Sequence, residues 1–155
     1  MENLERYKHL NKYLKDKFGE RTLKICIDGG FSCPNRDGSI SNGGCIFCSE
    51  RGSGDHIKLQ SGSCCIASFI SNQVKNYFNT YKAERANKFI AYFQNFTNTY
   101  DSISNLKLKY DSALIDNRIV ALAIATRPDC INEDICKLLK SYCDKYYVWV
   151  ELGLQ

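Results

Sequence analysis

Apolar residues recur along this chain with a spacing that switches repeatedly from helical to extended. The helical segments place apolar side chains three or four residues apart, whereas the extended segments are alternating or nearly continuous apolar runs. The expected helices carry the stripes Leu4 to Phe18, Ile66 to Tyr81, Ile103 to Leu114 and Ile135 to Cys143. The expected strands are Thr22 to Phe31, Lys88 to Phe96, Ile119 to Ala125 and Tyr146 to Leu152. This order, α-β-α-β-α-β-α-β, predicts an α/β fold: a parallel sheet with helices on its outside.

Polar clusters follow each expected strand. They are Cys33 after the first, Gln94 to Thr99 after the second, Thr126 to Asp129 after the third, and Glu151 to Gln155 after the fourth. In parallel α/β folds, ligands bind at the carboxyl ends of the strands. We therefore expect one binding site along this edge of the sheet, although any single cluster could be an ordinary turn.

The segment after the first strand contains three cysteines spaced Cys33-x11-Cys45-x2-Cys48. Two thiolates in a C-x-x-C can reach one iron-sulfur cluster, and Gly43 and Gly44 allow the backbone to turn close to a bulky inorganic group. Clusters of the [4Fe-4S] type ordinarily take four cysteines. Three cysteines therefore predict an iron-sulfur site in which one iron stays open to another ligand.

A zinc site is the alternative, because C-x-x-C is also half of a zinc knuckle and His56 follows Cys48 closely. The neighbouring Cys64 and Cys65 are adjacent rather than spaced by two, so they supply no second knuckle. We expect the four isolated cysteines to be small buried hydrophobic residues. They are Cys26, Cys130, Cys136 and Cys143.

Composition and charge narrow the classes of protein. The chain has 155 residues, of which 44% are hydrophobic and 25% charged, as in a globular domain. It shows neither a long apolar run nor a signal-peptide pattern, so we expect a cytoplasmic protein with reduced cysteines and no membrane partner. The net charge is +4, and a basic N-terminal helix is either a solvated face or a contact for a polyanion such as RNA.

Several segments together resemble the radical S-adenosylmethionine (radical SAM) superfamily. They are the Cys33-x11-Cys45-x2-Cys48 spacing with Phe47 before the last cysteine, Phe93 to Tyr100 (FQNFTNTY), Thr126 to Asp129 (TRPD) and Glu151 to Gln155 (ELGLQ). More narrowly, Arg6 to Leu14 (RYxxLNxYL) is similar to an Elongator-like bacterial family of largely unassigned substrate. The resemblance covers the whole chain.

The resemblance implies a role for each matching residue. Cys33, Cys45 and Cys48 hold three irons, and S-adenosylmethionine chelates the fourth. Phe47 packs near the adenine. Asn98 or Thr99 contacts the methionine amino group, while Glu151 and Gln155 face the ribose. Arg127, beside Asp129, contacts the methionyl carboxylate or the substrate; a turn held by an internal Arg127–Asp129 pair is the alternative.

The resemblance also implies the chemistry and the partners. An electron from the reduced cluster, delivered by a reductant such as flavodoxin or ferredoxin, cleaves S-adenosylmethionine to methionine and a 5′-deoxyadenosyl radical. Elongator-like relatives act on transfer RNA, which makes tRNA the implied partner.

The superfamily core is a partial (β/α)6 barrel. We therefore expect an N-terminal helical extension over residues 1–22 and the first four strands of an incomplete radical SAM core over 23–155. On this interpretation the chain is a fragment with weak or no turnover. A zinc-stabilised RNA-binding module and a non-catalytic truncated remnant stay open as alternatives.

Overall fold

The computed structural model describes residues 6–52 and 65–153, in which helices and parallel strands alternate as the hydrophobic pattern predicts. The helices are α1 (Leu10–Phe18), α2 (Ile66–Phe78), α3 (Ile103–Ala113) and α4 (Glu133–Tyr142). The strands are β1 (Thr22–Ile27), β2 (Lys88–Phe93), β3 (Ile119–Thr126) and β4 (Tyr147–Leu152). Short 3₁₀ helices lie at Ala83–Arg85 and Pro128–Cys130.

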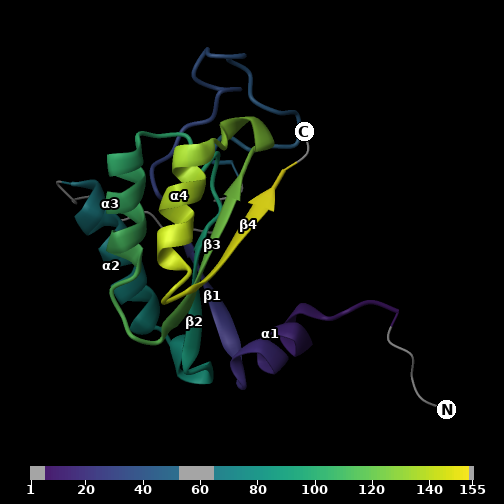
Figure 1. The fold of residues 1–155 in the computed structure, drawn as a ribbon, viewed down its shortest axis with the longest axis vertical. Coiled ribbons are helices and arrows are strands. Elements are labelled where there is room, and N and C mark those ends of the chain that lie inside the picture. The colour runs from purple at the N-terminus through teal and green to yellow at the C-terminus, as the bar shows by residue number, and fades with distance from the viewer. Residues whose placement is uncertain (1–5, 53–64, 154–155) are drawn as a thin grey trace.

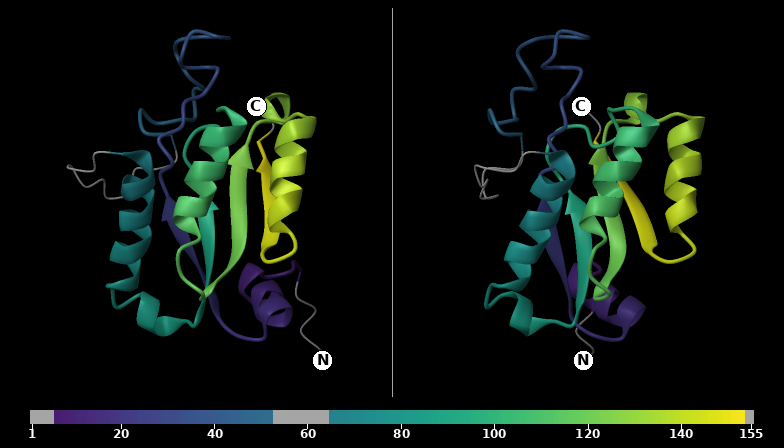
Figure 2. Two further views of the ribbon diagram at one scale, coloured as in Figure 1. Left: turned by 60° about the vertical axis from the view of Figure 1, so that its left-hand side comes forward. Right: turned by 90° about the vertical axis from the view of Figure 1, so that its left-hand side faces the viewer.

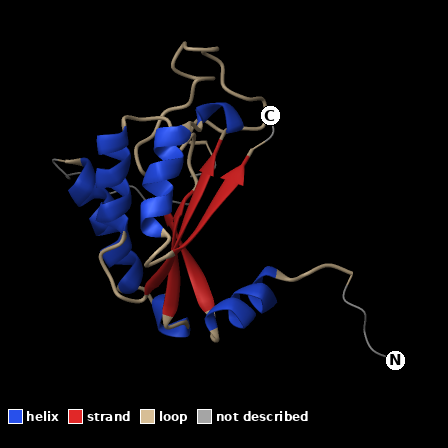
Figure 3. Cartoon of the chain, viewed as in Figure 1, coloured by secondary structure: helices blue, strands red, loops and turns tan. Residues whose placement is uncertain are grey.

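The sheet has the order β1-β2-β3-β4, and every neighbouring pair is parallel. All four strands therefore point their carboxyl ends toward the same edge, and the loop that follows β1 rises above this edge (Figure 3). We call this edge the upper rim. The predicted α/β class with a parallel sheet and outer helices is confirmed.

Helices α2, α3 and α4 cover one face of the sheet (Figures 1 and 2). Beneath them Phe89, Phe93, Leu122 and Ile124 are fully buried. The rings of Phe93 and Tyr110 meet edge to face with their centroids 5.3 Å apart, which joins β2 to α3. This face holds the main hydrophobic core.

The opposite face carries a smaller core near the amino ends of the strands. There Leu14 of α1 packs against Ile90, Ala121 and Ala123. Figure 1 shows α1 near the lower ends of the strands, on the side of the sheet away from the other helices. The upper half of this face, toward the rim, carries the polar side chains described below.

The first two strands end earlier than their apolar runs predict. β1 was expected to reach Phe31 but ends at Ile27, because the Asp28 carboxylate accepts a hydrogen bond from the backbone N of Gly30 at 2.8 Å. That contact forms a turn, and Gly30 has a positive φ of 61°. β2 was expected to reach Phe96 but ends at Phe93, where the backbone leaves the sheet.

Two of the helices differ from their predicted extents. α1 begins at Leu10 rather than near Leu4, and Tyr7 is exposed. α2 ends at Phe78 with Asn79 as its C-cap, so Tyr81 lies outside the helix and is exposed. In the described ranges no helix is both long enough and apolar enough to cross a membrane.

The expectation that the isolated cysteines are buried is wrong for two of them. Cys136 and Cys143 are exposed, because the buried stripe of α4 consists of Ile135, Leu138, Leu139 and Tyr142. Cys26 and Cys130 are half-buried. None of these four cysteines is a fully buried core residue.

The buried side chains of β3, one of the two inner strands, should contribute strongly to stability. Replacing the fully buried Leu122 of β3 by Ala should lower the free energy of unfolding by about 2–5 kcal/mol, through lost apolar burial and the cavity left behind. Urea denaturation followed by circular dichroism measures the change. The control is Leu108→Ala on the exposed face of α3, which should cost about 0.5 kcal/mol or less. Equal losses in both variants would contradict the assignment of the core.

Candidate functional site

The three cysteines lie in a loop that is folded back on itself by backbone hydrogen bonds. The backbone N of Arg36 donates to the Cys33 carbonyl at 2.8 Å, and the N of Gly44 donates to the Asn35 carbonyl at 2.8 Å. The N of Cys48 donates to the Cys45 carbonyl at 2.9 Å, which makes the C-x-x-C one tight turn. The two ends of the long excursion from Cys33 are therefore joined. We call residues 33–52 the cysteine loop.

One sulfur already has a hydrogen-bond donor. The Asn35 side-chain amide donates from Nδ2 to the Cys45 sulfur at 3.1 Å. Cys33 and Cys45 are half-buried, whereas Cys48 is exposed. Hydrogen bonds to sulfur are one means by which proteins stabilise thiolates and tune the potential of iron-sulfur clusters.

The cysteine loop and the upper rim together enclose a cavity of about 470 Å³. We call it the rim cavity. Its cysteine-loop walls include Cys33, Asn35, Arg36, Gly44, Cys45, Phe47, Cys48 and Gly52. Its rim walls include Phe96, Thr97, Ala125, Thr126, Arg127, Glu151, Leu152 and Gly153. Six of the residues expected at the site thus share one cavity.

The cysteines do not converge on a single point. Among residues 6–52 and 65–153, no group of three His, Cys, Asp or Glu side chains is arranged to hold one metal ion. A four-iron cluster differs from a single ion, because each cysteine binds a different iron of a body of several atoms. The zinc alternative includes His56, which lies outside the described residues, as do Cys64 and Gln155.

The loop after β2 brings two residues into the rim cavity that the sequence analysis did not single out. Phe96 has a positive φ of 59°, an uncommon conformation for a residue with a Cβ atom. The neighbouring Thr97 is 1% exposed, and its Oγ1 finds no hydrogen-bond partner among the described residues. The segment Phe93 to Tyr100 indicates that this loop belongs to the site, but the sequence alone does not show which of its side chains faces the cavity.

Asn98 and Thr99, the residues expected to contact the methionine amino group, do not line the rim cavity. Asn98 Nδ2 donates to the Ala125 carbonyl at 2.7 Å. Thr99 Oγ1 donates to the Cys130 carbonyl at 2.6 Å and also lies 2.6 Å from Thr126 Oγ1. Thr99 borders a different cavity of about 540 Å³, beside the amino end of α4. Both side chains fasten the loop to β3 and to the turn beyond it.

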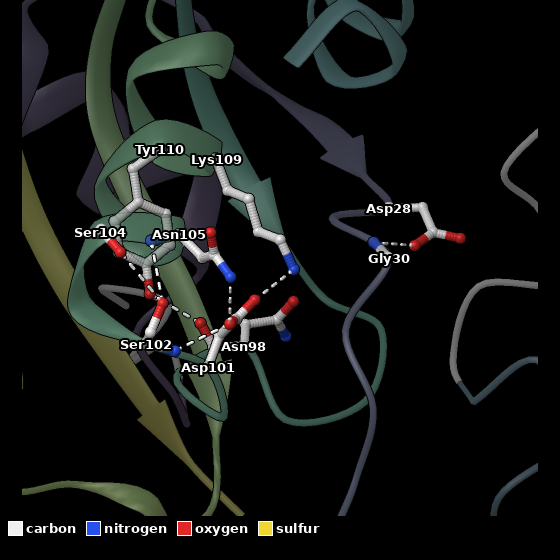
Figure 4. Close-up of polar contacts among 9 residues, drawn as sticks. All are labelled: Asp28, Gly30, Asn98, Asp101, Ser102, Ser104, Asn105, Lys109 and Tyr110. Atoms are coloured by element: carbon white, nitrogen blue, oxygen red, sulfur yellow. Dashed lines mark hydrogen bonds and ion pairs between the residues drawn. The ribbon is translucent and has the colours of Figure 1, made fainter. Parts of the chain in front are cut away.

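Helix α3 anchors the same loop from the other side (Figure 4). The Tyr110 hydroxyl donates to the Asn98 carbonyl at 2.6 Å, and Lys109 Nζ pairs with the Asp101 carboxylate at 2.9 Å. The Lys109 side chain is only 8% exposed. Burial by itself would raise the pKa of Asp101, but hydrogen bonds from Lys109 and Asn105 hold this pKa below its ordinary value. The loop is thus held by a largely buried ion pair.

Arg127 forms the internal pair that was the alternative to a ligand contact. Its guanidinium donates twice to the Asp129 carboxylate, at 2.9 and 2.7 Å. These hydrogen bonds raise the pKa of Arg127 and lower the pKa of Asp129. Within residues 6–52 and 65–153, the remaining terminal nitrogen, Nη1, is buried without a partner, and Arg127 lines the rim cavity. The pairing therefore leaves one donor for a ligand.

Glu151 projects from the end of β4, on the face of the sheet away from α2, α3 and α4. It accepts hydrogen bonds from Tyr92 at 2.5 Å, Trp149 at 3.1 Å and Lys24 at 3.3 Å. Burial would raise the pKa of Glu151, but these donors hold it below its ordinary value. Burial and the bond to Glu151 raise the pKa of Tyr92. The carboxylate is therefore ionised and fixed in orientation at neutral pH.

Known proteins similar to this chain carry no assigned activity in their names. The chain is 42% identical to the uncharacterized protein YtqA of Bacillus subtilis over 97% of its own length and 45% of the relative. It is 39% identical to protein YhcC of Escherichia coli over 92% of its length and 43% of the relative. An uncharacterized protein of Methanocaldococcus jannaschii is 35% identical over 92% of this chain and 42% of the relative.

The chain thus spans about half the length of the curated relatives it matches. No protein-family model matches it, and no solved structure matches it.

Removing the charge of Asp101 should loosen the loop after β2. Asp101→Asn leaves the Lys109 ammonium largely buried without its carboxylate, which should cost about 2–4 kcal/mol of stability at pH 7. Because the pKa of Asp101 in the folded state is lowered, the pair stabilises the fold above about pH 3.9 and loses this effect as the pH falls through the folded value. The difference from wild type should therefore shrink in acid.

Denaturation at several pH values measures this dependence. The control is Lys137→Met, which removes an exposed pair with Glu133 on α4 and should change stability by about 0.5 kcal/mol or less. A loss in Asp101→Asn that is the same at every pH would show that the ion pair is not its cause.

Proposed function

We propose that this chain carries the cluster and cofactor site of a radical S-adenosylmethionine enzyme. In this proposal Cys33, Cys45 and Cys48 bind three irons of a [4Fe-4S] cluster, and S-adenosylmethionine binds the fourth. The observation that carries the proposal is the cavity that all three cysteines share with Arg127 and Glu151. When bound, the two groups supply a 5′-deoxyadenosyl radical that abstracts hydrogen from a substrate.

The donor set fits an iron-sulfur cluster. Thiolates are the ligands that such clusters take from proteins, and three of them leave one iron for a ligand that is not protein. The amide of Asn35 donates to one of the three sulfurs. All three cysteines line one cavity, so one body could be reached by all of them.

The rim supplies groups that match S-adenosylmethionine. Arg127 Nη1 and Thr97 Oγ1 are buried donors without partners, and a carboxylate of the ligand would satisfy them. The Glu151 carboxylate can accept hydrogen bonds from ribose hydroxyls. Phe47 is 67% exposed and offers an aromatic surface for adenine. Because the side chains of Asn98 and Thr99 bind elsewhere, this proposal gives them no contact with the methionine amino group, and Thr97 is the residue of the loop after β2 that contacts the ligand, at the ligand's carboxylate.

We further propose that the four strands, with the helices α2, α3 and α4 that connect them, belong to a partial (β/α)6 barrel. Three helices cover one face of the sheet, while toward the rim β3 presents the small side chains of Ala121, Ala123 and Ala125 on the other. A barrel interior needs such a face, because the cofactor and substrate occupy the space in front of it. The extra length of the matched relatives supports the same proposal.

The partners follow from this chemistry. A cluster that delivers electrons needs a reductant, such as flavodoxin or ferredoxin. The +4 net charge and the basic last turn of α1, with Lys15 and Lys17, support contact with a polyanion, for which tRNA is our proposal.

Anaerobic reconstitution with iron and sulfide tests the cluster. We expect a brown protein with about four irons per chain, because three thiolates suffice to hold a [4Fe-4S] cluster whose fourth iron is open. The variant with Cys33, Cys45 and Cys48 all replaced by Ala should stay colourless. The control replaces the exposed Cys65, Cys136 and Cys143 and should retain the colour. About one zinc and no iron would instead favour a zinc-stabilised RNA-binding module.

Glu151→Gln tests the cofactor site. Loss of the carboxylate should weaken S-adenosylmethionine binding to the reconstituted protein by about 10- to 100-fold, the usual range for hydrogen bonds to a charged group. Anaerobic equilibrium dialysis measures the affinity. Glu133→Gln on exposed α4 is the control. Unchanged affinity in Glu151→Gln would remove Glu151 from the site while leaving the cluster assignment intact.

A further inference from the structure

Arg36 is the side chain that ties the two ends of the cysteine loop together. It follows Cys33 by three residues, and its guanidinium reaches the segment just beyond the C-x-x-C. There it donates from Nη2 to the carbonyls of Cys48 at 3.3 Å and Ser49 at 2.5 Å, and from Nη1 to the carbonyl of Glu50 at 3.2 Å. One side chain thus binds three consecutive carbonyls.

The guanidinium also contacts the loop after β2. Its central carbon lies 5.5 Å from the centre of the Phe96 ring, and both residues line the rim cavity. Within residues 6–52 and 65–153, no carboxylate forms an ion pair with Arg36, whereas Arg127 is paired with Asp129. Arg36 therefore brings a positive charge, balanced only by carbonyl dipoles, to the cavity that the three cysteines line.

The backbone leaves room for this arrangement at one glycine. Gly44 has a positive φ of 71°, and a Cβ atom there would lie 2.9 Å from Arg36 Nε and 3.1 Å from its Cζ. A side chain would displace the guanidinium as well as strain the backbone. The adjacent Gly43 has no such neighbour within 4 Å. The two neighbouring glycines therefore differ in two respects: Gly44 has a positive φ and contacts Arg36, whereas Gly43 has neither property.

We infer that Arg36 is a positioning residue, which holds Cys48 and its turn against the arm that carries Cys33 and brings a positive charge to the cavity that the cysteines line. This inference rests on the proposed function, in which the three cysteines bind one cluster. Arginine suits the role because its planar guanidinium donates several hydrogen bonds in fixed directions, whereas lysine presents a single compact ammonium. A nearby positive charge also favours the more negative, reduced state of a cluster.

The test combines two substitutions at Arg36 with substitutions of glycines. Arg36→Met removes the charge and all three hydrogen bonds, whereas Arg36→Lys keeps the charge alone. Gly44→Ala displaces the guanidinium while Arg36 remains; Gly43→Ala controls for an added methyl group, and Gly38→Ala, at a positive φ of 91° without contact to Arg36, controls for backbone strain. Arg118→Met is a further control, because Arg118 also lies over a phenylalanine ring, 3.9 Å from that of Phe78, but just before the amino end of β3, away from the rim. Circular dichroism checks that each variant is folded.

The first measurement needs no iron. Cobalt(II) titration of the reduced protein, followed by thiolate-to-cobalt charge-transfer absorption, reports how readily the cysteines gather around a metal; the triple cysteine variant gives the background. We expect Arg36→Met and Gly44→Ala to bind cobalt about tenfold or more weakly than wild type, as loss of hydrogen bonds from a charged donor implies. Gly43→Ala, Gly38→Ala and Arg118→Met should match wild type.

The second measurement is the reduction potential of the reconstituted cluster. Arg36→Met should lower this potential relative to wild type, and Arg36→Lys should restore much of the difference, which a purely structural role would not produce. Wild-type cobalt affinity and potential in Arg36→Met would overturn the inference. If wild type binds cobalt through its thiolates with the expected dependence on Arg36 but assembles no iron-sulfur cluster, the proposed function fails and the role of Arg36 stands.

Discussion

The register of the parallel sheet is the constraint on which the candidate site depends. β3 pairs with both β2 and β4, aligning Ile124 with Phe93 and Ala125 with Glu151. Residues far apart in sequence therefore end at one level, and the cysteine loop lies above them. A shift of one residue in β4 would turn Glu151 toward the core under the helices, because side chains alternate between the two faces of a strand. The hydrophobic packing that fixes this register thus also places the polar groups of the rim.

The polar rim is stabilised by hydrogen bonds that leave selected groups unsatisfied. Asn98 Nδ2, Thr99 Oγ1 and the Tyr110 hydroxyl fasten the loop after β2. Among the described residues, four side-chain atoms of this region are buried without partners: Asn95 Oδ1, Thr97 Oγ1, Asn98 Oδ1 and Arg127 Nη1. Unpaired buried groups cost stability, and two of the four residues, Thr97 and Arg127, line the rim cavity. The fastening side chains and the side chains that offer donors to a ligand are neighbours in sequence but face different ways.

The helices, the strands and the site differ in how far the sequence predicts them. The spacing of Ile135, Leu138 and Leu139 predicts α4, because it places apolar side chains on one face of a helix. The continuous apolar run of β3 predicts a strand that is buried on both faces. The ends of β1 and β2 were predicted too late, since the turn at Asp28 and the positive φ of Phe96 depend on local contacts that hydrophobicity does not encode.

The sequence likewise predicts the location of the candidate site but not the directions of its side chains. The cysteine spacing and the polar clusters indicate where the site lies, as the shared cavity of Cys33, Arg127 and Glu151 illustrates. The direction in which each side chain points was not predictable, because it depends on contacts between distant segments. Thr97 rather than Asn98 faces the cavity, and Arg36 reaches Ser49 across the loop. Both features require the folded backbone.

Electron paramagnetic resonance of the reduced, reconstituted chain tests most directly whether one iron is open to S-adenosylmethionine. If Cys33, Cys45 and Cys48 hold three irons and the rim holds the cofactor, adding S-adenosylmethionine should change the spectrum of the reduced cluster, because the ligands of the fourth iron change. The same addition should leave the spectrum of a cluster with four protein ligands unaltered. A [4Fe-4S] signal that is identical with and without saturating S-adenosylmethionine would contradict the proposed radical enzyme.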